Sequence, residues 1–186
     1  MSAVALRPVT PADSERLHVW RNQPDVARWM YTDHLISAEE HARWFAAAMA
    51  DPSRRYWIIE LDGEPVGLAN LADISLANRK CAWAYYLASP SVRGKGVGAY
   101  VEFWMIEHVF KDLGLDKLCC EVLVENEAVW KIHESFGFRR EAHYRHHVWK
   151  AGVPHDAYGL ALLAEDWARA RAESADRLRA KGYAVD

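Results

Sequence analysis

The sequence contains few cysteines and no long hydrophobic run. Only three cysteines, Cys81, Cys119 and Cys120, occur in 186 residues, and none is part of a C-x-x-C pair. This number and spacing indicate neither a disulfide framework nor a zinc site. No apolar stretch approaches the roughly 18 residues of a membrane helix, and charges interrupt the first residues, MSAVALRPVTPADSERL, where a signal peptide needs an apolar core. We therefore expect a soluble, reduced, cytoplasmic protein without a metal and without membrane contact.

A strong charge of either sign is also absent. Lys and Arg number 23 against 26 Asp and Glu, which gives a net charge of −3. Because the chain has no basic surplus, nucleic-acid binding is not expected. A hydrophobic fraction of 51% is typical of globular proteins, and the length suits one core. We expect a single domain over residues 1–186, in which residues 163–186 form a helical tail.

Hydrophobic patterning predicts strands and helices in mixed order. Alternating or aromatic-rich runs predict strands at 4–6, 55–61, 64–71, 81–89, 117–126, 140–150 and 155–163. Helical spacing, with start signals such as Ser37 and Glu40 in S-x-x-E, predicts helices at 10–22, 36–49, 99–114, 126–138 and 164–181. Residues 72–80 are expected to form a polar turn. The strand–helix–strand unit at 81–124 must pair its strands in parallel, so we expect an α/β fold with a mixed sheet.

The stretch SPSVRGKGVGAYVEFW, residues 89–104, joins a predicted strand to a predicted helix. Its glycines let the backbone approach a ligand, and the free N–H groups of a helix start attract anions. A P-loop does not fit, because Lys95 is followed by Gly96 and not by Ser or Thr. The dinucleotide fingerprint G-x-G-x-x-G does not fit the glycines at 94, 96 and 98. Taken alone, the loop is either an anion cradle or simply a turn into a helix.

Two motifs together resemble one family. Arg93, Gly96 and Gly98 match an R-x-x-G-x-G signature, and the later segment NEAVWKIHESFGF, from Asn126 to Phe138, matches its asparagine and closing Gly-Phe pair. In this order and spacing the motifs resemble the GNAT acyltransferase superfamily. The resemblance covers nearly the whole chain. It implies the GNAT fold, a mixed central sheet with splayed parallel strands flanked by helices, and acetyl-CoA as the acetyl donor.

The resemblance also implies a coenzyme site. Backbone groups of Tyr86, Leu87 and Ala88 would bind the pantetheine arm, which Asn126 would also contact. The pyrophosphate would lie against the loop residues Arg93, Gly94, Lys95, Gly96, Val97, Gly98 and Ala99.

The reaction implied by the resemblance is direct attack of a neutral amine on the thioester in a ternary complex, where alignment of the reactants supplies much of the rate. His133 stands where many GNAT enzymes have a tyrosine acid, and it would contact the coenzyme and protonate the leaving thiolate; a histidine that only packs beside the coenzyme is the alternative. The Leu87 N–H would donate to the oxyanion. Asn70 would hold a water that takes the amine proton, with Asp73 or Glu121 beyond it.

The first third of the chain resembles a narrower group. The segments Trp20–Tyr31 and Ile36–Trp44 are similar to the N-acetyltransferases of the pseudaminic acid (flagellin nonulosonate) pathway, which acetylate the 4-amino group of a UDP-linked 4-amino-4,6-dideoxy sugar. An arginine such as Arg21 can bind the diphosphate with two parallel hydrogen bonds, and aromatic rings can stack on uracil or on the face of a deoxy sugar. The substrate residues expected from this resemblance are Arg21, Trp29, Met30, Tyr31, His41, Trp44, Asn70, Asp73, Trp83 and Tyr86.

Other interpretations stay open at this level. Arg21 could instead complement the dipole at the end of a helix. His41, Trp29 and Trp44 could instead be packing residues rather than ligand residues. A protein N-terminal acetyltransferase of the ribosomal-protein type and a non-catalytic acyl-CoA sensor are the alternative functions. The histidines of HYRHH are expected to belong to a polar hairpin rather than to a metal site. The terminal helix is expected to be a solvated face, in a monomer or a homodimer.

Overall fold

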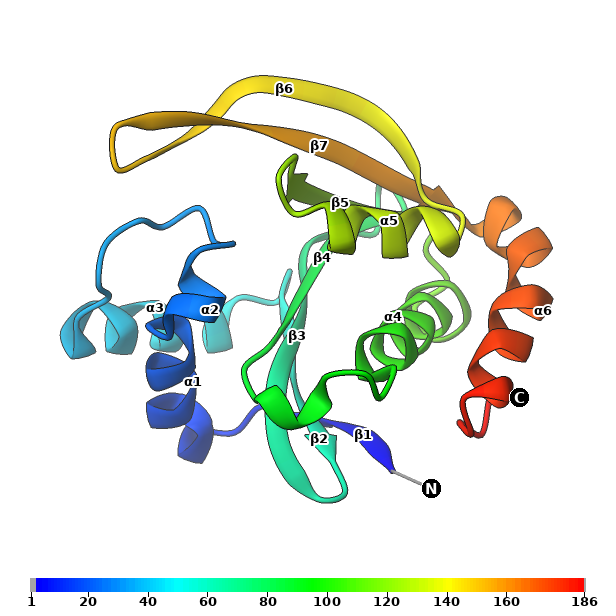
Figure 1. The fold of residues 1–186 in the computed structure, drawn as a ribbon, viewed down its shortest axis with the longest axis horizontal. Coiled ribbons are helices and arrows are strands. Elements are labelled where there is room, and N and C mark those ends of the chain that lie inside the picture. The colour runs from blue at the N-terminus through cyan, green and yellow to red at the C-terminus, as the bar shows by residue number, and fades with distance from the viewer. Residues whose placement is uncertain (1–2, 186) are drawn as a thin grey trace.

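The computed structural model of the protein describes residues 3–185. Within that range, helices flank one sheet of seven strands, as Figure 1 shows. The strands are β1 (Val4–Pro8), β2 (Arg55–Leu61), β3 (Glu64–Ser75), β4 (Lys80–Leu87), β5 (Lys117–Leu123), β6 (Arg139–Lys150) and β7 (Val153–Leu163). The α-helices are α1 (Ser14–Arg21), α2 (Pro24–Ala27), α3 (Ala38–Ala50), α4 (Val97–Glu107), α5 (Glu127–Ser135) and α6 (Ala164–Ala180). The expected α/β class with a mixed sheet is confirmed.

The order of strands in the sheet is β1-β2-β3-β4-β5-β7-β6, and β4 and β5 are its parallel neighbours. Their pairing covers Lys80–Ala82 against Lys117–Cys119. By contrast, β5 pairs with β7 over its full length, from Lys117 to Leu123. Beyond Ala82 the two parallel strands therefore separate, and the backbone edges that face the gap have no sheet partner. This is the splay that the family resemblance implies.

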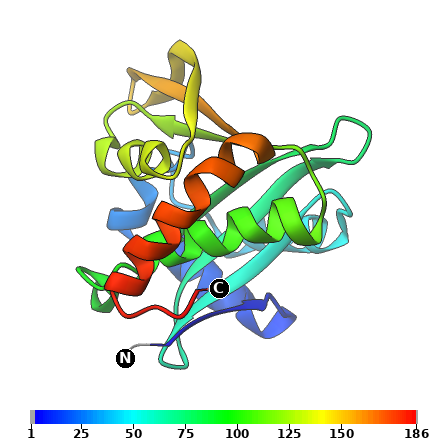
Figure 2. The ribbon, with the colours of Figure 1, turned by 90° about the vertical axis from the view of Figure 1, so that its right-hand side faces the viewer.

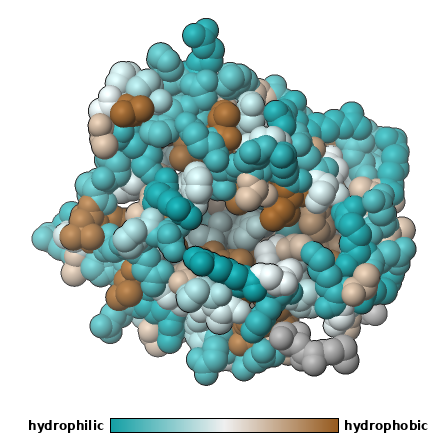
Figure 3. All heavy atoms as spheres, viewed as in Figure 1, coloured by the Kyte–Doolittle hydropathy of each residue, from teal (hydrophilic) through white to brown (hydrophobic). Residues whose placement is uncertain are grey.

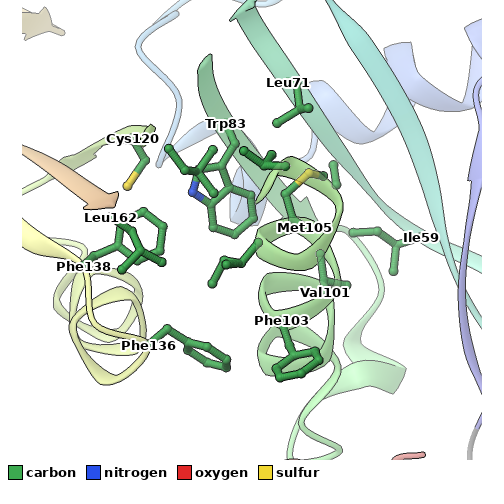
Figure 4. Packing of buried hydrophobic residues seen from close by; sticks show 14 of the residues in the cluster. Ile59, Leu71, Trp83, Val101, Phe103, Met105, Cys120, Phe136, Phe138 and Leu162 are labelled. Atoms are coloured by element: carbon green, nitrogen blue, oxygen red, sulfur yellow. The ribbon is translucent and has the colours of Figure 1, made fainter. Parts of the chain in front are cut away.

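The sheet buries side chains on both faces. Ile58 and Ile59, neighbours in β2, point to opposite faces because side chains alternate along a strand, and both are fully buried. Ile58 packs with Leu17 of α1, whereas Ile59 belongs to the larger core beneath α4. Figure 4 shows this larger core, with Trp83 and Met105 side by side between sheet and helix. The gap between β4 and β5 therefore lies in a sheet that is packed on both faces.

Helix α6 is not the solvated face that its charges predict. Trp167, Ala175 and Leu178 recur at helical spacing and are buried. The ring centroid of Trp167 lies 5.4 Å from that of Phe103 in α4. Figures 1 and 2 show α6 outside α4, which lies between it and the sheet. The expectation was wrong because arginines on the outer side of the helix hide a narrow apolar stripe.

The expected turn over residues 72–80 is also shorter than predicted. Strand β3 continues to Ser75, and the pairing with β4 is irregular between Ala72 and Ser75. Asp73 adopts a φ of 51° within this irregularity. A bulge of this kind lets polar residues stay in a strand while the strand bends. The start of α3 is as predicted, since the Glu40 N–H donates to the Ser37 Oγ over 3.1 Å.

Candidate functional site

Three clefts meet around the gap between β4 and β5. The strand cleft, about 510 Å³, lies between β4, β5 and α5. The entry cleft, about 850 Å³, lies between the α2 region and the end of β4, and the loop cleft, about 630 Å³, lies between the loop before α4, α5 and α6. Tyr85 lines all three clefts, so they adjoin at this side chain. Figure 3 shows the hollow near the centre of one face. This arrangement suits an elongated ligand that meets a second ligand.

The loop before α4 is shaped to present backbone N–H groups. Gly94 and Gly96 both adopt a φ of +74°, a region that side-chain-bearing residues rarely enter. Gly96 is the N-cap of α4, so the first N–H groups of the helix have no partner within it. A Cβ atom on Gly98 would lie 3.0 Å from the Tyr85 hydroxyl oxygen. The splayed strands and this positive helix start fit the arm and the pyrophosphate of coenzyme A.

Leu87 offers a free donor to the gap. The neighbouring Ala88 donates its N–H to the Val66 carbonyl over 2.7 Å, and Leu87 lies opposite Gly67 in β3. In an antiparallel pair, successive residues alternate between bonding to the partner strand and facing away from it. The Leu87 N–H therefore faces the side on which β5 has separated. The N–H of Ala88, in contrast, is already used by β3.

Glu102 of α4 and His133 of α5 form a buried pair beside the strand cleft. The His133 Nδ1 lies 2.8 Å from the Glu102 Oε1, and neither side chain is more than 4% exposed. Burial would lower the pKa of His133, but the facing carboxylate outweighs it and raises that pKa to about 10. Burial also raises the pKa of Glu102. The Cys120 thiol lies beside the same imidazole. Because its pKa is raised well above 7, the His133 imidazole holds its proton at neutral pH.

Most of the residues expected at the site line one of the clefts. In the strand cleft the structure brings together Trp29, Met30, Tyr31, Asn70, Asp73, Trp83, Asn126 and His133. The entry cleft is lined by Tyr86, Leu87, Ala88 and Arg93. The loop cleft is lined by Leu87, Gly94, Gly96, Val97, Gly98 and Ala99.

His41 and Trp44 line none of the three clefts described above. The buried His41 ring lies 5.0 Å from that of His18 and 5.4 Å from that of Trp44, measured between centroids. Burial lowers the pKa of His41, which favours its neutral form. Trp44 packs edge-on against Tyr56 of β2. Both side chains therefore join α3 to the sheet and to α1. Lys95 is outside the clefts as well.

Arg21 does not line the entry cleft but lies near Tyr86, which does. Its Nη1 is buried and has no hydrogen-bond partner among the described residues. The nearby Tyr86, which lines the cleft, also has a buried hydroxyl without a partner. Burial lowers the pKa of the guanidinium. A buried donor of this kind is costly unless an acceptor reaches it.

The carboxylates expected to receive the amine proton are on the strand cleft. Glu121 lines it and accepts a hydrogen bond from the Tyr31 hydroxyl over 3.0 Å. The same carboxylate lies 3.2 Å from His147 of the hairpin. Asp73 lines the cleft from the bulge in β3. Glu121 therefore links β5 to the segment that follows α2.

Tyr85 and Glu102 also belong to the site, although the sequence did not predict them. Glu102 has apolar neighbours on both sides in the helix VGAYVEFWMIE, and an acidic residue on a buried helix face was the available signal. Tyr85 gave no comparable signal, because its neighbours on β4 are also aromatic. Its position became clear only from the splay.

Three of the four histidines of the β6–β7 hairpin, His143, His147 and His155, face a carboxylate. His143 lies 2.8 Å from Asp156, and His155 lies 3.0 Å from Glu125. Over residues 3–185, no group of three His, Cys, Asp or Glu side chains is placed to hold a metal ion. In the same part of the chain, every helix is too short or too polar to cross a membrane.

Known proteins share this architecture. A family model described as an acetyltransferase (GNAT) domain matches residues 4–139. Spermidine N(1)-acetyltransferase of Escherichia coli is 26% identical over 165 residues, which are 89% of this chain and 88% of that protein. The acetyltransferase PseH of Campylobacter jejuni is 27% identical over 138 residues, 73% of this chain and 84% of that protein.

A solved structure shows the same fold. The spermidine N-acetyltransferase of Vibrio cholerae in complex with CoA and spermine superimposes with a TM-score of 0.82 at 21% identity, and the match covers 89% of this chain and 98% of that chain. With a family match over most of the chain and a sheet that splays beside the glycine-rich loop before α4, the protein belongs to the GNAT acetyltransferase family and is an acetyl-CoA-dependent N-acetyltransferase.

Proposed function

We propose that the acceptor is the 4-amino group of a UDP-linked 4-amino-4,6-dideoxy sugar, of the UDP-4-amino-4,6-dideoxy-N-acetyl-altrosamine type, as in nonulosonate biosynthesis for flagellin glycosylation. The resemblance of Trp20–Tyr31 and Ile36–Trp44 to the enzymes of that pathway supports the proposal. The names of other relatives, a spermidine and an aminoglycoside acetyltransferase, also point to small-molecule amines. A protein N-terminus fits these relatives less well.

The unpaired guanidinium nitrogen of Arg21 carries the proposal. Arg21 is half-buried, and one of its guanidinium nitrogens is buried without an acceptor. Such a nitrogen favours an anionic ligand, because the anion restores the hydrogen bond and offsets the desolvation of the charge. A nucleotide diphosphate is such a ligand, whereas a polyamine is a cation. Tyr86, next to Arg21 and on the entry cleft, adds a hydroxyl for the same group.

Residues of this chain would each have a separate role in the reaction. Acetyl-CoA, when bound, supplies the acetyl thioester. The Leu87 N–H faces the gap and would donate to the carbonyl oxygen of the reacting group. His133, kept protonated by Glu102, would donate a proton to the leaving sulfur. A water held by Asn70 of β3 would take the amine proton, and Glu121 of β5 would pass it on toward solvent.

A polyamine is the second candidate, and the carboxylates of the strand cleft favour it. Asp73, Glu121 and Glu141 all line that cleft. Two of them already have partners in the protein, since Glu121 accepts from Tyr31 and Glu141 is paired with Lys117. This pairing leaves Asp73 as the carboxylate best able to bind an ammonium group. The charge of Arg21 opposes the same ligand.

Mass spectrometry of reaction mixtures tests the proposal. The purified protein is incubated with acetyl-CoA and, separately, with the UDP-4-amino-4,6-dideoxy sugar, spermidine, or a peptide with a ribosomal-protein N-terminus. We expect acetylation of the sugar nucleotide. Acetylation of spermidine or of the peptide, with an unchanged sugar nucleotide, would overturn the proposal.

Substitution of Arg21 is a second test of the proposed acceptor. Arg21→Gln removes the cation next to Tyr86 and should raise the KM for the sugar nucleotide about 10-fold or more, the value of one charge-assisted hydrogen bond. The KM for acetyl-CoA should stay the same. Arg43→Gln is the control, because Arg43 is an exposed residue of α3 paired with Glu39. An unchanged KM in Arg21→Gln contradicts a role in acceptor binding.

A further inference from the structure

The chain beyond α6 folds back onto the loop that precedes α4. Gly182, with a φ of +86°, ends the helix. The Tyr183 N–H donates to the Leu178 carbonyl over 3.1 Å and the Gly182 N–H to that of Arg179 over 2.9 Å, the pattern of a glycine helix stop. Figure 2 shows the end of α6, in red, beside the green loop at the start of α4. This segment lies outside residues 4–139, the part matched by the family model.

Tyr183 attaches the segment to the loop. Its side chain is 7% exposed, and its hydroxyl donates to the Lys95 carbonyl over 2.5 Å. Its ring centroid lies 5.0 Å from that of Tyr100 in α4. Because a trans peptide points its C=O and N–H in opposite directions, this bond also fixes the direction of the Gly96 N–H. The tail therefore orients one of the donors at the start of α4.

Lys181 lies across Gly96. Its Cδ is 3.1 Å and its Nζ 3.8 Å from the place where a Cβ of Gly96 would be, and the side chain lines the loop cleft. Among the salt bridges of residues 3–185, none pairs Lys181 with a carboxylate. A cation beside the positive start of a helix is unfavourable by itself. An anion between the ammonium group and the helix start would satisfy both.

We propose that Lys181 binds the pyrophosphate of the coenzyme, and that Tyr183 is a positioning residue for this contact. The C-terminal segment then forms the outer wall of the phosphate site, opposite the N–H groups of the loop. The other cation on the same wall, Arg177, is already bonded to the Ser135 carbonyl and to Glu173, so it joins α6 to α5. The inference concerns the donor and is independent of the acceptor proposed above.

Calorimetric binding of three donor analogues to the whole protein tests the assignment. CoA carries the pyrophosphate and a 3′-phosphate, 3′-dephospho-CoA carries the pyrophosphate alone, and pantetheine carries neither. Lys181→Ala should weaken CoA and 3′-dephospho-CoA by the same factor, about 5- to 10-fold, and leave pantetheine unchanged. Tyr183→Phe should weaken the same two ligands by a smaller factor. Arg169→Ala, an exposed arginine of α6, is the matched control and should change none of the dissociation constants.

Three outcomes would overturn the inference. CoA affinity within twofold of the wild-type value in Lys181→Ala excludes a contact with phosphate. An equal loss for pantetheine means that the substitution disturbs packing rather than a phosphate site. A loss for CoA with none for 3′-dephospho-CoA moves the contact to the 3′-phosphate and refutes the assignment to the pyrophosphate.

Discussion

The Glu102 Oε1 lies 2.8 Å from the His133 Nδ1, and both side chains are buried, His133 with 4% of its side chain exposed. The two residues come from different helices, α4 and α5, whose positions are fixed by the core around Trp83. The ring centroid of Trp83 lies 5.3 Å from that of His133. One face of the imidazole is therefore packed while the side chain lines the strand cleft. This pairing couples the sheet-facing side of α4 to the reaction site.

Glu102→Gln should change the pH dependence of the enzyme. The carboxylate raises the pKa of His133 to about 10, so His133 is protonated below that pH and loses its proton above it. Without the carboxylate, burial alone lowers the pKa of His133 below its ordinary value near 6.5. The alkaline limb of kcat/KM should therefore move from near pH 10 to below about pH 7.

The measurement is a pH–rate profile with the titration of His133 followed by NMR. Glu127→Gln is the matched control, because Glu127 is an exposed residue of α5 paired with Lys131. Its profile should equal that of the wild type. A Glu102→Gln profile with an unmoved alkaline limb would show that the carboxylate does not hold the proton on His133.

His133→Ala should lower kcat more than it weakens coenzyme binding. A thiolate with a pKa near the cysteine reference of about 8.5 is a fair leaving group, so the loss should be near the low end of general-acid effects, about 100-fold or less. Steady-state kinetics gives kcat, and calorimetry gives the Kd for CoA. A wild-type kcat in this variant removes His133 from proton transfer and leaves it a packing role.

Gly96→Ala should weaken the binding of CoA. A side chain at a φ of +74° costs about 1–2 kcal/mol, and relief of this strain moves the donors at the start of α4. The expected loss of affinity is about 5- to 30-fold. Gly152→Ala is the matched control, since Gly152 has a φ of +76° in the distant β6–β7 hairpin and no atom within 4 Å of an added Cβ. Equal affinities in the two variants would contradict a role of the loop geometry.

The coenzyme side was more predictable than the acceptor side. The glycines at 94, 96 and 98 and the segment from Asn126 to Phe138 predicted a strand–loop–helix that the structure contains, because local backbone requirements are written in local sequence. The splay itself follows from pairing between distant strands. A ligand contact of His41 and Trp44 stays a prediction, since the sequence does not tell on which side of α3 the sheet packs and both residues lie outside the three clefts.

Contacts between elements that are far apart in the sequence were the hardest features to predict. Glu102 and the apolar stripe of α6 both depend on how α4 packs, which is a long-range property. The tail residue Tyr183 bonds to Lys95, 88 positions earlier in the chain, and neither residue type predicts the other. Burial of a charge becomes interpretable only with its partner, which in each case comes from another element.

Asp13→Asn should destabilise the fold and remove part of its acid sensitivity. Asp13 is 1% exposed and receives hydrogen bonds from Arg7, Arg16 and the Thr10 N–H. The Arg7 guanidinium holds the pKa of Asp13 well below its usual range. The pair therefore stabilises the protein fully above the unfolded pKa of about 3.9, and the contribution is lost as the pH falls toward the folded pKa.

Urea unfolding at several pH values measures this contribution. At pH 7 the variant should lose about 2–3 kcal/mol of unfolding free energy, and the difference from wild type should shrink between about pH 5 and pH 2. Asp176→Asn, at an exposed residue paired with Arg179, should stay within about 0.5 kcal/mol of wild type. Curves for Asp13→Asn and wild type that run parallel down to low pH would show that the carboxylate of Asp13 is not linked to folding through its proton, and that the network around Arg7 is held by geometry alone.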